Sequence, residues 1–200
     1  MSRPSILPIG TSLLYKKHDL LGDAIGLGEW TNGREDADYC HIALVYDGKQ
    51  LVRQNPGGPA FETLDSQDWQ YIDAFLLDLQ GREIVTGPTE TKEEVWAAAF
   101  ERARLKHWTE GYAYLSFGEL ISEDVLSRLG DGGGTDKLRS ETNAMMYRHQ
   151  SICSVWAWQE VLTDAVRDAY QWPDFVMFAK LGMGQARPAD AVLCPWLDRP

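Results

Sequence analysis

Cysteine is scarce in this chain, which has only Cys40, Cys153 and Cys194 in 200 residues. An odd number of widely spaced cysteines does not support the disulfide framework of a small secreted domain, so reduced thiols are the simpler expectation. The N-terminal stretch also lacks the apolar core and the small-residue cleavage pattern of a secretory signal peptide. Together these features predict a protein that is cytoplasmic as synthesised.

The usual spacings of metal ligands and phosphate-binding loops are missing as well. Cys40 and His41 are adjacent, but neighbouring strand residues point to opposite faces, and no CxxC or HExxH motif is present. The Gly-rich segment from Gly130 does not match a phosphate-binding loop and is predicted to be a surface loop. The sequence therefore predicts neither a metal site nor a cofactor.

Positive charge is in short supply. Lys and Arg number 19 against 30 Asp and Glu, the formal net charge is -11, and the basic residues are scattered in small groups. Such a balance repels phosphate backbones and anionic membranes, so neither nucleic acid nor a membrane surface is an expected partner. No apolar run approaches the roughly 18 to 20 residues that span a bilayer.

What is present predicts one α+β domain over residues 1–200, because this length suits a single core and nothing resembles a hinge. Apolar and β-branched runs predict an antiparallel sheet. The central strand is expected at 39–46, followed by an Asp-Gly turn. The other expected strands begin at Thr11, Gln50 and Tyr71, and the second of these is expected to end at the PGGP series from Pro56.

Two helices are expected to pack against this sheet. The first begins at Thr91, because Glu94 three residues later completes a capping-box pattern. The second begins at Cys153, and its apolar residues recur at helical spacing until Pro173 lies past its end.

Cys153 is the strongest candidate for chemistry. A thiol at a helix N-terminus is easier to ionise and has backbone N–H donors beside it, which suits a nucleophile. His41, at the start of an apolar strand, is a candidate base, and His149 is a substitute. The alternatives are a small buried cysteine and a core histidine. His18 and His107 are interpreted as surface or loop residues.

The order of the segments resembles a known family. A His-led strand CHIALVYDG, a following strand LVRQNPGGPAFETLD, a GxxY segment in GYAY and a late Cys-led helix come in that order. This order resembles the circularly permuted papain-like hydrolases, relatives of the NlpC/P60 cell-wall peptidases that include YiiX-like and lecithin retinol acyltransferase-like proteins. RPADAVL resembles the closing strand that such proteins carry after the helix.

The resemblance implies roles for particular residues. Cys153 would be the nucleophile, His41 the general base, and a third polar residue would orient the imidazole. Gln54 is the candidate for the third role, with Asn55 and Glu62 as alternatives. YiiX-like members tend to have Glu followed by Ala at the positions of Gln54 and Asn55, so this chain departs from that pattern.

Two aromatic residues are predicted to contact substrate. Tyr114 fits the GxxY spacing from Gly111, and Trp156 belongs to the aromatic environment of Cys153. A core position is the alternative for an aromatic residue in such a segment.

The implied activity is hydrolysis of an amide bond through a thioester, in the stem peptides of bacterial cell walls. A chain without an export signal would reach the wall by another route, such as a phage particle, so virion assembly partners are expected in that case. One rival is a lipid or thioester acyl hydrolase or acyltransferase. Another is an inactive papain-like module with a structural or binding role, for example in a virus tail.

Overall fold

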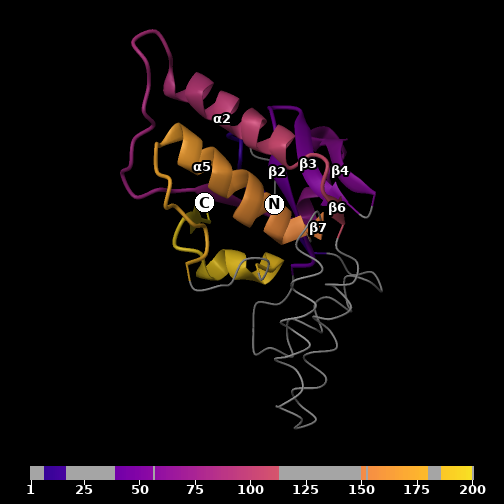
Figure 1. The fold of residues 1–200 in the computed structure, drawn as a ribbon. Helices are drawn as coiled ribbons and strands as arrows, with labels where there is room; N and C mark the ends of the chain where they lie inside the picture. The colour runs from indigo at the N-terminus through magenta and orange to yellow at the C-terminus, as the bar shows by residue number, and fades with distance from the viewer. Residues whose placement is uncertain are drawn as a thin grey trace.

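The computed structural model describes residues 7–16, 39–55, 57–112, 150–151, 153–179 and 186–199 (Figure 1). Within them, six strands form one antiparallel sheet in the order β4-β3-β2-β1-β5-β8. The strands are β1 (Ser12–Tyr15), β2 (His41–Val45), β3 (Gln50–Asn55), β4 (Gly58–Thr63), β5 (Ile72–Leu77) and β8 (Leu197–Asp198). The prediction of an α+β fold with an antiparallel sheet is confirmed.

The PGGP series from Pro56 was expected only to end a strand, but its last two residues, Gly58 and Pro59, begin the strand β4. Strand β4 begins at Gly58, whose φ of +102° is a left-handed conformation that glycine adopts readily, and it pairs with β3 along its whole length. The hairpin between β2 and β3 turns at 47–49. The Asp47 carboxylate accepts hydrogen bonds from the backbone N–H groups of Lys49 (2.6 Å) and Gln50 (2.8 Å).

Side chains alternate along the strands and divide the core into two clusters. One cluster lies between the sheet and the helices, and we call this side of the sheet the helix face; its strand residues are Leu14, Ile42, Leu44, Val52 and Phe75. The other cluster defines the second face of the sheet; its strand residues are Leu13, Tyr15, Ala43, Val45, Leu51 and Ile72.

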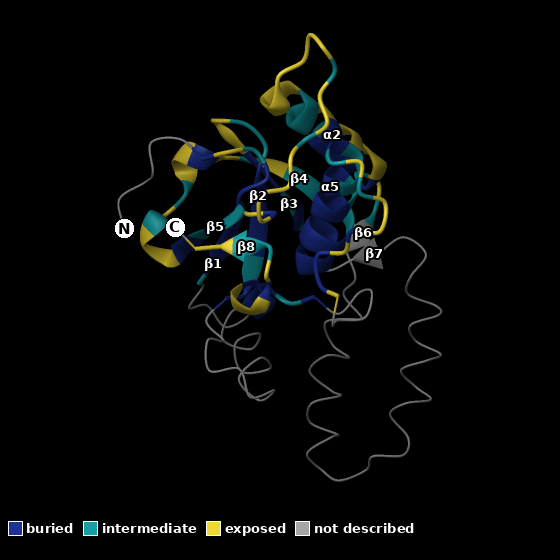
Figure 2. Ribbon diagram, turned by 90° about the vertical axis from the view of Figure 1, so that its left-hand side faces the viewer, coloured by how far each residue is buried: buried dark blue, intermediate teal, exposed yellow. Residues whose placement is uncertain are grey.

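The helices lie side by side on the helix face (Figure 1). Helix α2 (Lys92–Lys106) begins with the predicted capping box, in which Thr91 and Glu94 satisfy each other's backbone N–H groups. The second helix starts at Cys153, continues as the π-helical stretch η3 (Val155–Leu162) and ends as α5 (Thr163–Ala169). This second helix is the more deeply buried of the two (Figure 2).

The second helix is fixed to the sheet by Trp158. Its side chain is fully buried, and the indole N–H donates to Ser12 Oγ of β1 at 2.9 Å. A buried indole donor without a partner would be costly, so this hydrogen bond fixes where along the sheet the helix packs.

The segment RPADAVL does not form the closing strand that the resemblance implied. It forms the 3₁₀ helix η4 (Pro188–Leu193), in which Pro188 occupies the first turn and the Asp190 carboxylate accepts from the Arg187 backbone N–H at 2.7 Å. Proline lacks the N–H that a ladder needs, which explains the difference. The strand that closes the sheet is β8, a few residues later, and it pairs with β5.

Four further short elements, two 3₁₀ turns and two short strands, are described. The 3₁₀ turns η1 (Leu64–Ser66) and η2 (Trp69–Tyr71) connect β4 to β5. Strands β6 (Gly111–Tyr112) and β7 (Gln150–Ser151) form a separate parallel pair. No helix among the described residues is long and apolar enough to cross a membrane.

Replacing Thr91 with Ala removes the side-chain acceptor of the capping box. We expect the free energy of unfolding to fall by about 1 kcal/mol, because a backbone N–H at the start of α2 loses its partner. Urea denaturation of Thr91→Ala measures the loss, and Thr89→Ala in the preceding turn is the matched control. Equal stability of the two variants would contradict a role for the cap.

Candidate active site

Cys153 lies at the start of the second helix, as the sequence analysis predicted. Its side chain belongs to the cluster on the helix face and is only 5% exposed. Ser154, the next residue, donates its hydroxyl to the carbonyl of Ala186 at 2.6 Å, which ties the first turn of the helix to the segment before η4. The start of the helix is therefore held in place.

Residues 107–112 contact the chain on both sides of Cys153, and we call them the cradle segment. Before Cys153, strand β7 pairs with β6, with Gly111 opposite Gln150 and Tyr112 opposite Ser151. After Cys153, the indole N–H of the fully buried Trp156 donates to the carbonyl of His107 at 2.9 Å. The placement of Cys153 thus depends on the cradle segment.

Gln54 also contacts the cradle segment. It follows Val52 by two residues on β3, so it lies on the helix face, and it is fully buried. Its side-chain amide donates to the carbonyl of Glu110 at 3.0 Å. The structure therefore brings Gln54 and Cys153 to the same part of the molecule.

His41 lies on the opposite face of the sheet. Along β2, Ile42 and Leu44 belong to the cluster that includes Cys153, whereas Ala43 and Val45 belong to the other cluster. The ring of His41 contacts that of Tyr15 on this second face, with the centroids 5.9 Å apart. The described arrangement does not bring the predicted base and nucleophile together.

Asn55 and Glu62, the alternatives for the third role, share the second face with His41. The register between β2 and β3, in which Leu44 pairs with Val52, places Asn55 opposite His41 if it continues. The Glu62 carboxylate forms an ion pair with Arg53 on the neighbouring strand. The predicted site residues are thus divided between the two faces.

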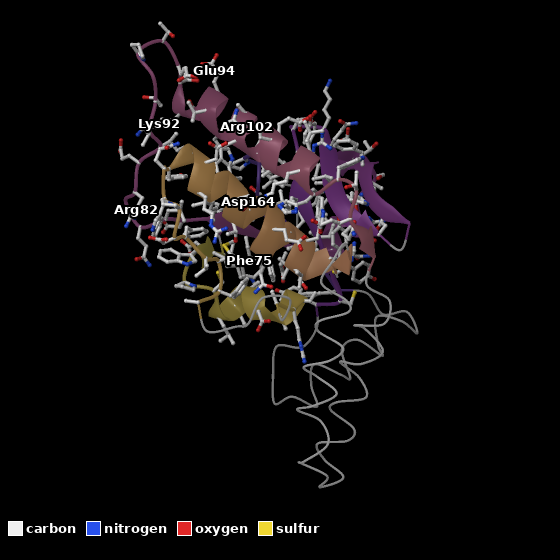
Figure 3. The ribbon with its side chains drawn as sticks, viewed as in Figure 1. Phe75, Arg82, Lys92, Glu94, Arg102 and Asp164 are labelled. Atoms are coloured by element: carbon white, nitrogen blue, oxygen red, sulfur yellow. The ribbon has the colours of Figure 1, made fainter. Side chains whose placement is uncertain are left out.

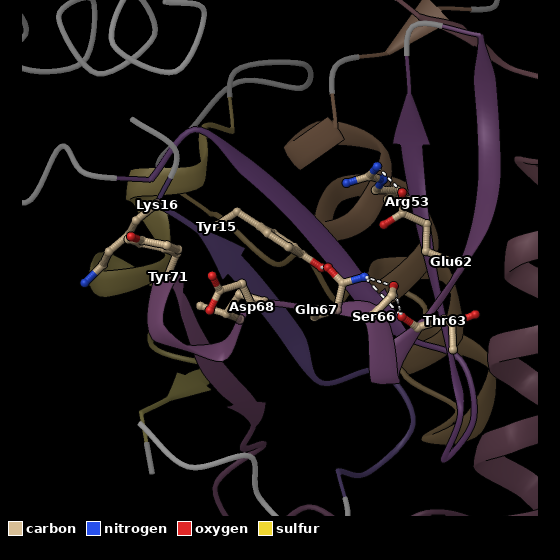
Figure 4. A pocket seen from close by; sticks show the side chains of 10 residues that line it. Tyr15, Lys16, Arg53, Glu62, Thr63, Ser66, Gln67, Asp68 and Tyr71 are labelled. Carbon is tan, nitrogen blue, oxygen red and sulfur yellow. Dashed lines mark hydrogen bonds and ion pairs between the residues drawn. The ribbon is translucent and has the colours of Figure 1, made fainter. Parts of the chain in front are cut away.

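A pocket of about 700 Å³ opens on the second face of the sheet (Figure 4). Its lining includes Tyr15, Lys16, Arg53, Glu62 and Tyr71. The Tyr15 hydroxyl donates to Gln67 at 2.9 Å, and burial raises the pKa of this phenol. Tyr15, which lines the pocket, is also the residue whose ring contacts His41.

Trp156 lies in the core, where it has no exposed surface with which to contact substrate. Its indole N–H donates inside the protein, to the carbonyl of His107, and contact with substrate stays a prediction. Tyr114, His149 and the Gly-rich segment from Gly130 lie outside the described residues.

His107 was interpreted as a surface or loop residue, but it is only 9% exposed. Its Nδ1 lies 2.6 Å from a Glu110 carboxylate oxygen, and its Nε2 lies 2.9 Å from Asp164 on α5. Asp164 also accepts from Lys106 at 2.6 Å. The i, i+3 spacing of His107 and Glu110 was visible in the sequence, but the approach of Asp164 was not.

The charges in this cluster stabilise each other. Burial alone would lower the pKa of His107, but the hydrogen bonds to Asp164 and Glu110 outweigh burial and raise this pKa to about 9. Burial would raise the pKa of Asp164, but hydrogen bonds from His107 and Lys106 lower it to about 2. At neutral pH the cluster therefore contains an imidazolium between two carboxylates.

The same cluster includes a third carboxylate. Potential ligand atoms of His107, Glu110 and Glu160 lie within 4.8 Å of one another, so metal binding is one interpretation of the group. Both ring nitrogens of His107 already face carboxylates. We therefore interpret the group as a partly buried ion-pair cluster.

In comparisons with known proteins, no family model matches the chain and no curated protein is significantly similar to it. The resemblance to permuted papain-like hydrolases consequently rests on the order of segments in the sequence.

Raising the pH should weaken the fold through His107. The ordinary pKa of a histidine is about 6.5, and the pKa of His107 in the fold is about 9, so its stabilisation is complete below pH 6.5 and is lost as the pH rises toward 9. We expect a loss of about 1 to 3 kcal/mol in the free energy of unfolding over this interval. Urea denaturation at several pH values measures it. If His107→Gln shows the same dependence on pH as the original protein, the assignment is wrong.

Proposed function

We propose that this chain is a cysteine hydrolase in which Cys153 attacks the carbonyl carbon of an amide bond. The observation that carries the proposal is the position of Cys153 at the start of a buried helix that packs on an antiparallel sheet. The start of a helix has the positive end of the helix dipole and backbone N–H donors, which favour a thiolate and would stabilise the oxyanion of a tetrahedral intermediate. Membership of the papain-like family is part of the same proposal.

The reaction would proceed in two steps. The Cys153 sulfur bonds to the carbonyl carbon, the C–N bond breaks, and the departing amine takes up the proton that the base removed from the thiol. Water then attacks the thioester, which releases the acid and restores the thiol. Because the family resemblance favours cell-wall hydrolysis, the proposed substrate is an amide bond in peptidoglycan stem peptides, and a phage particle is one route to it.

The proposed base is His41, which must act from a position different from the described one. His41 is the first residue of β2, so a change in the backbone torsions at Cys40 and His41 would turn the imidazole toward the helix face without disturbing the pairing of Ala43 and Val45. Gln54, already on that face, would accept a hydrogen bond from the imidazole and orient it.

A non-catalytic module is the second candidate, and the position of His41 favours it. With the imidazole against Tyr15, His41 and Cys153 lie on different faces of the sheet. The lipid acyl hydrolase has less support. That activity would be favoured by an apolar groove lined by tryptophan, but Trp156 and Trp158 are fully buried and line no such groove.

The rate at which iodoacetamide alkylates Cys153, followed against pH by mass mapping, separates the two candidates. An activated thiol should label rapidly below pH 7, and His41→Ala should slow this labelling at least about tenfold, because an ordinary thiol with a pKa near 8.5 is mostly protonated there. Cys194 is the internal control, since burial raises the pKa of its thiol to about 11.

Two further variants sharpen the result. His149→Ala tests the substitute base, and loss of labelling only in that variant would move the role of base away from His41. Cys153→Ala should abolish cleavage of purified stem peptides, as read by mass spectrometry. If the pH dependence of labelling is that of an ordinary thiol and neither histidine substitution changes it, the hydrolase proposal fails and the non-catalytic module is the candidate that remains.

A further inference from the structure

We propose that Asp164 is a positioning residue for Cys153 and acts through His107 and the cradle segment. This inference rests on the proposed function, in which Cys153 is the reacting thiol. Asp164 lies eleven residues after Cys153 on the same helix and has no described contact with that residue. Its influence would pass through the neighbouring chain.

The first step of the path is the contact between Asp164 and His107. The Asp164 carboxylate meets Nε2 of the imidazole at 2.9 Å, and the Glu110 carboxylate meets Nδ1 at 2.6 Å. The imidazole therefore links α5 to the turn that follows α2. Figure 3 shows Asp164 on α5 where this helix adjoins α2.

The second step is the contact between this turn and both sides of Cys153. The carbonyl of His107 receives the indole N–H of Trp156, three residues after Cys153. Strand β6 follows directly after Glu110 and pairs with β7, which ends two residues before Cys153. A shift of the turn would consequently move the backbone on either side of the thiol.

The third step connects the turn to the sheet. The Gln54 amide donates to the Glu110 carbonyl, so the residue proposed to orient the imidazole base depends on the same turn. Cys153 and Gln54 would thus both be positioned by the turn that this ion-pair cluster holds in place.

Other charged groups surround the cluster, and a substitution that tests Asp164 should leave them in place. Lys106 of α2 and Arg167 of α5 both donate to Asp164, at 2.6 and 3.4 Å, and Glu160 lies beside His107 and Glu110. Asp164→Asn preserves the shape of the side chain and removes only its charge. It therefore weakens the hold on His107 without opening a cavity.

The experiment compares Asp164→Asn with Asp168→Asn. Asp168 lies one turn later on the same helix, and its carboxylate pairs with Arg102 at 2.7 Å, away from the cradle segment. Two readouts are followed at pH 7 in the full chain: the alkylation rate of Cys153 and the indole N–H resonances of ¹⁵N-labelled tryptophans. Trp156 reports on the cradle segment, and Trp158, which donates to Ser12, is the internal reference.

In Asp164→Asn, we expect the Trp156 indole N–H to exchange with solvent at least about tenfold faster and Cys153 alkylation to change at least about threefold. Trp158 should be unaffected, and Asp168→Asn should change neither readout. Unchanged Trp156 or unchanged alkylation in Asp164→Asn would overturn the proposal. Equal changes at Trp156 and Trp158 would also overturn it, because they would indicate general loosening of the helix.

Glu110→Gln removes the other carboxylate partner of His107 and serves if Asp164→Asn does not fold. The same selective change at Trp156 and Cys153 is expected, and its absence would overturn the proposal. These readouts do not require an activated thiol. If Cys153 titrates as an ordinary thiol, the proposed hydrolase fails while the positioning role is still decided by the Trp156 signal.

Discussion

The alternation of side chains along β2 is the constraint on which the arrangement of the candidate site depends. A strand that is buried on both faces must divide its residues between two cores, and in β2 the division follows apolar volume. Ile42 and Leu44 fill the side that faces the helices, while Ala43 and Val45 fill the other. His41 precedes Ile42 in this alternation, so its side chain lies on the same face of the sheet as that of Ala43. The chemistry available to Cys153 is therefore set partly by how two hydrophobic clusters are filled.

Ion pairs help to hold loops and turns of this structure in place. In the cradle segment, Trp108 packs against the ring of Phe61, and His107 is bound between the carboxylates of Glu110 and Asp164. A similar arrangement exists on β5, where the buried Asp73 carboxylate meets Lys16, Arg199 and the hydroxyl of Tyr39. Buried carboxylates with several donors are strongly position-specific, since leaving one unpaired is costly.

Much of the fold could be predicted from local signals. The capping box at Thr91 and the apolar runs of β1, β2, β3 and β5 all appear where the sequence placed them, because these signals depend on neighbouring residues. The strand β4 was missed because its glycines and prolines resemble a break, and η4 was missed because apolar residues alone do not distinguish a strand from a short 3₁₀ helix.

The candidate site was less predictable than the fold for a physical reason. The position of Cys153 at a helix start is a local property, and the sequence contained it. The burial of His107 and the side of the sheet on which His41 lies depend on contacts between segments more than fifty residues apart, such as that between His107 and Asp164. Hydrophobic periodicity describes one element at a time and does not contain this information.

The π-helical stretch η3 has a consequence for the direction of the residues that it separates. In a regular α-helix, eleven residues amount to three turns plus about 20°, so Cys153 and Asp164 would point in nearly the same direction. The wider turns of η3 take up more residues per revolution and rotate the later part of the helix relative to the earlier part. This angular offset allows one continuous helix to direct Cys153 toward the sheet and Asp164 toward α2.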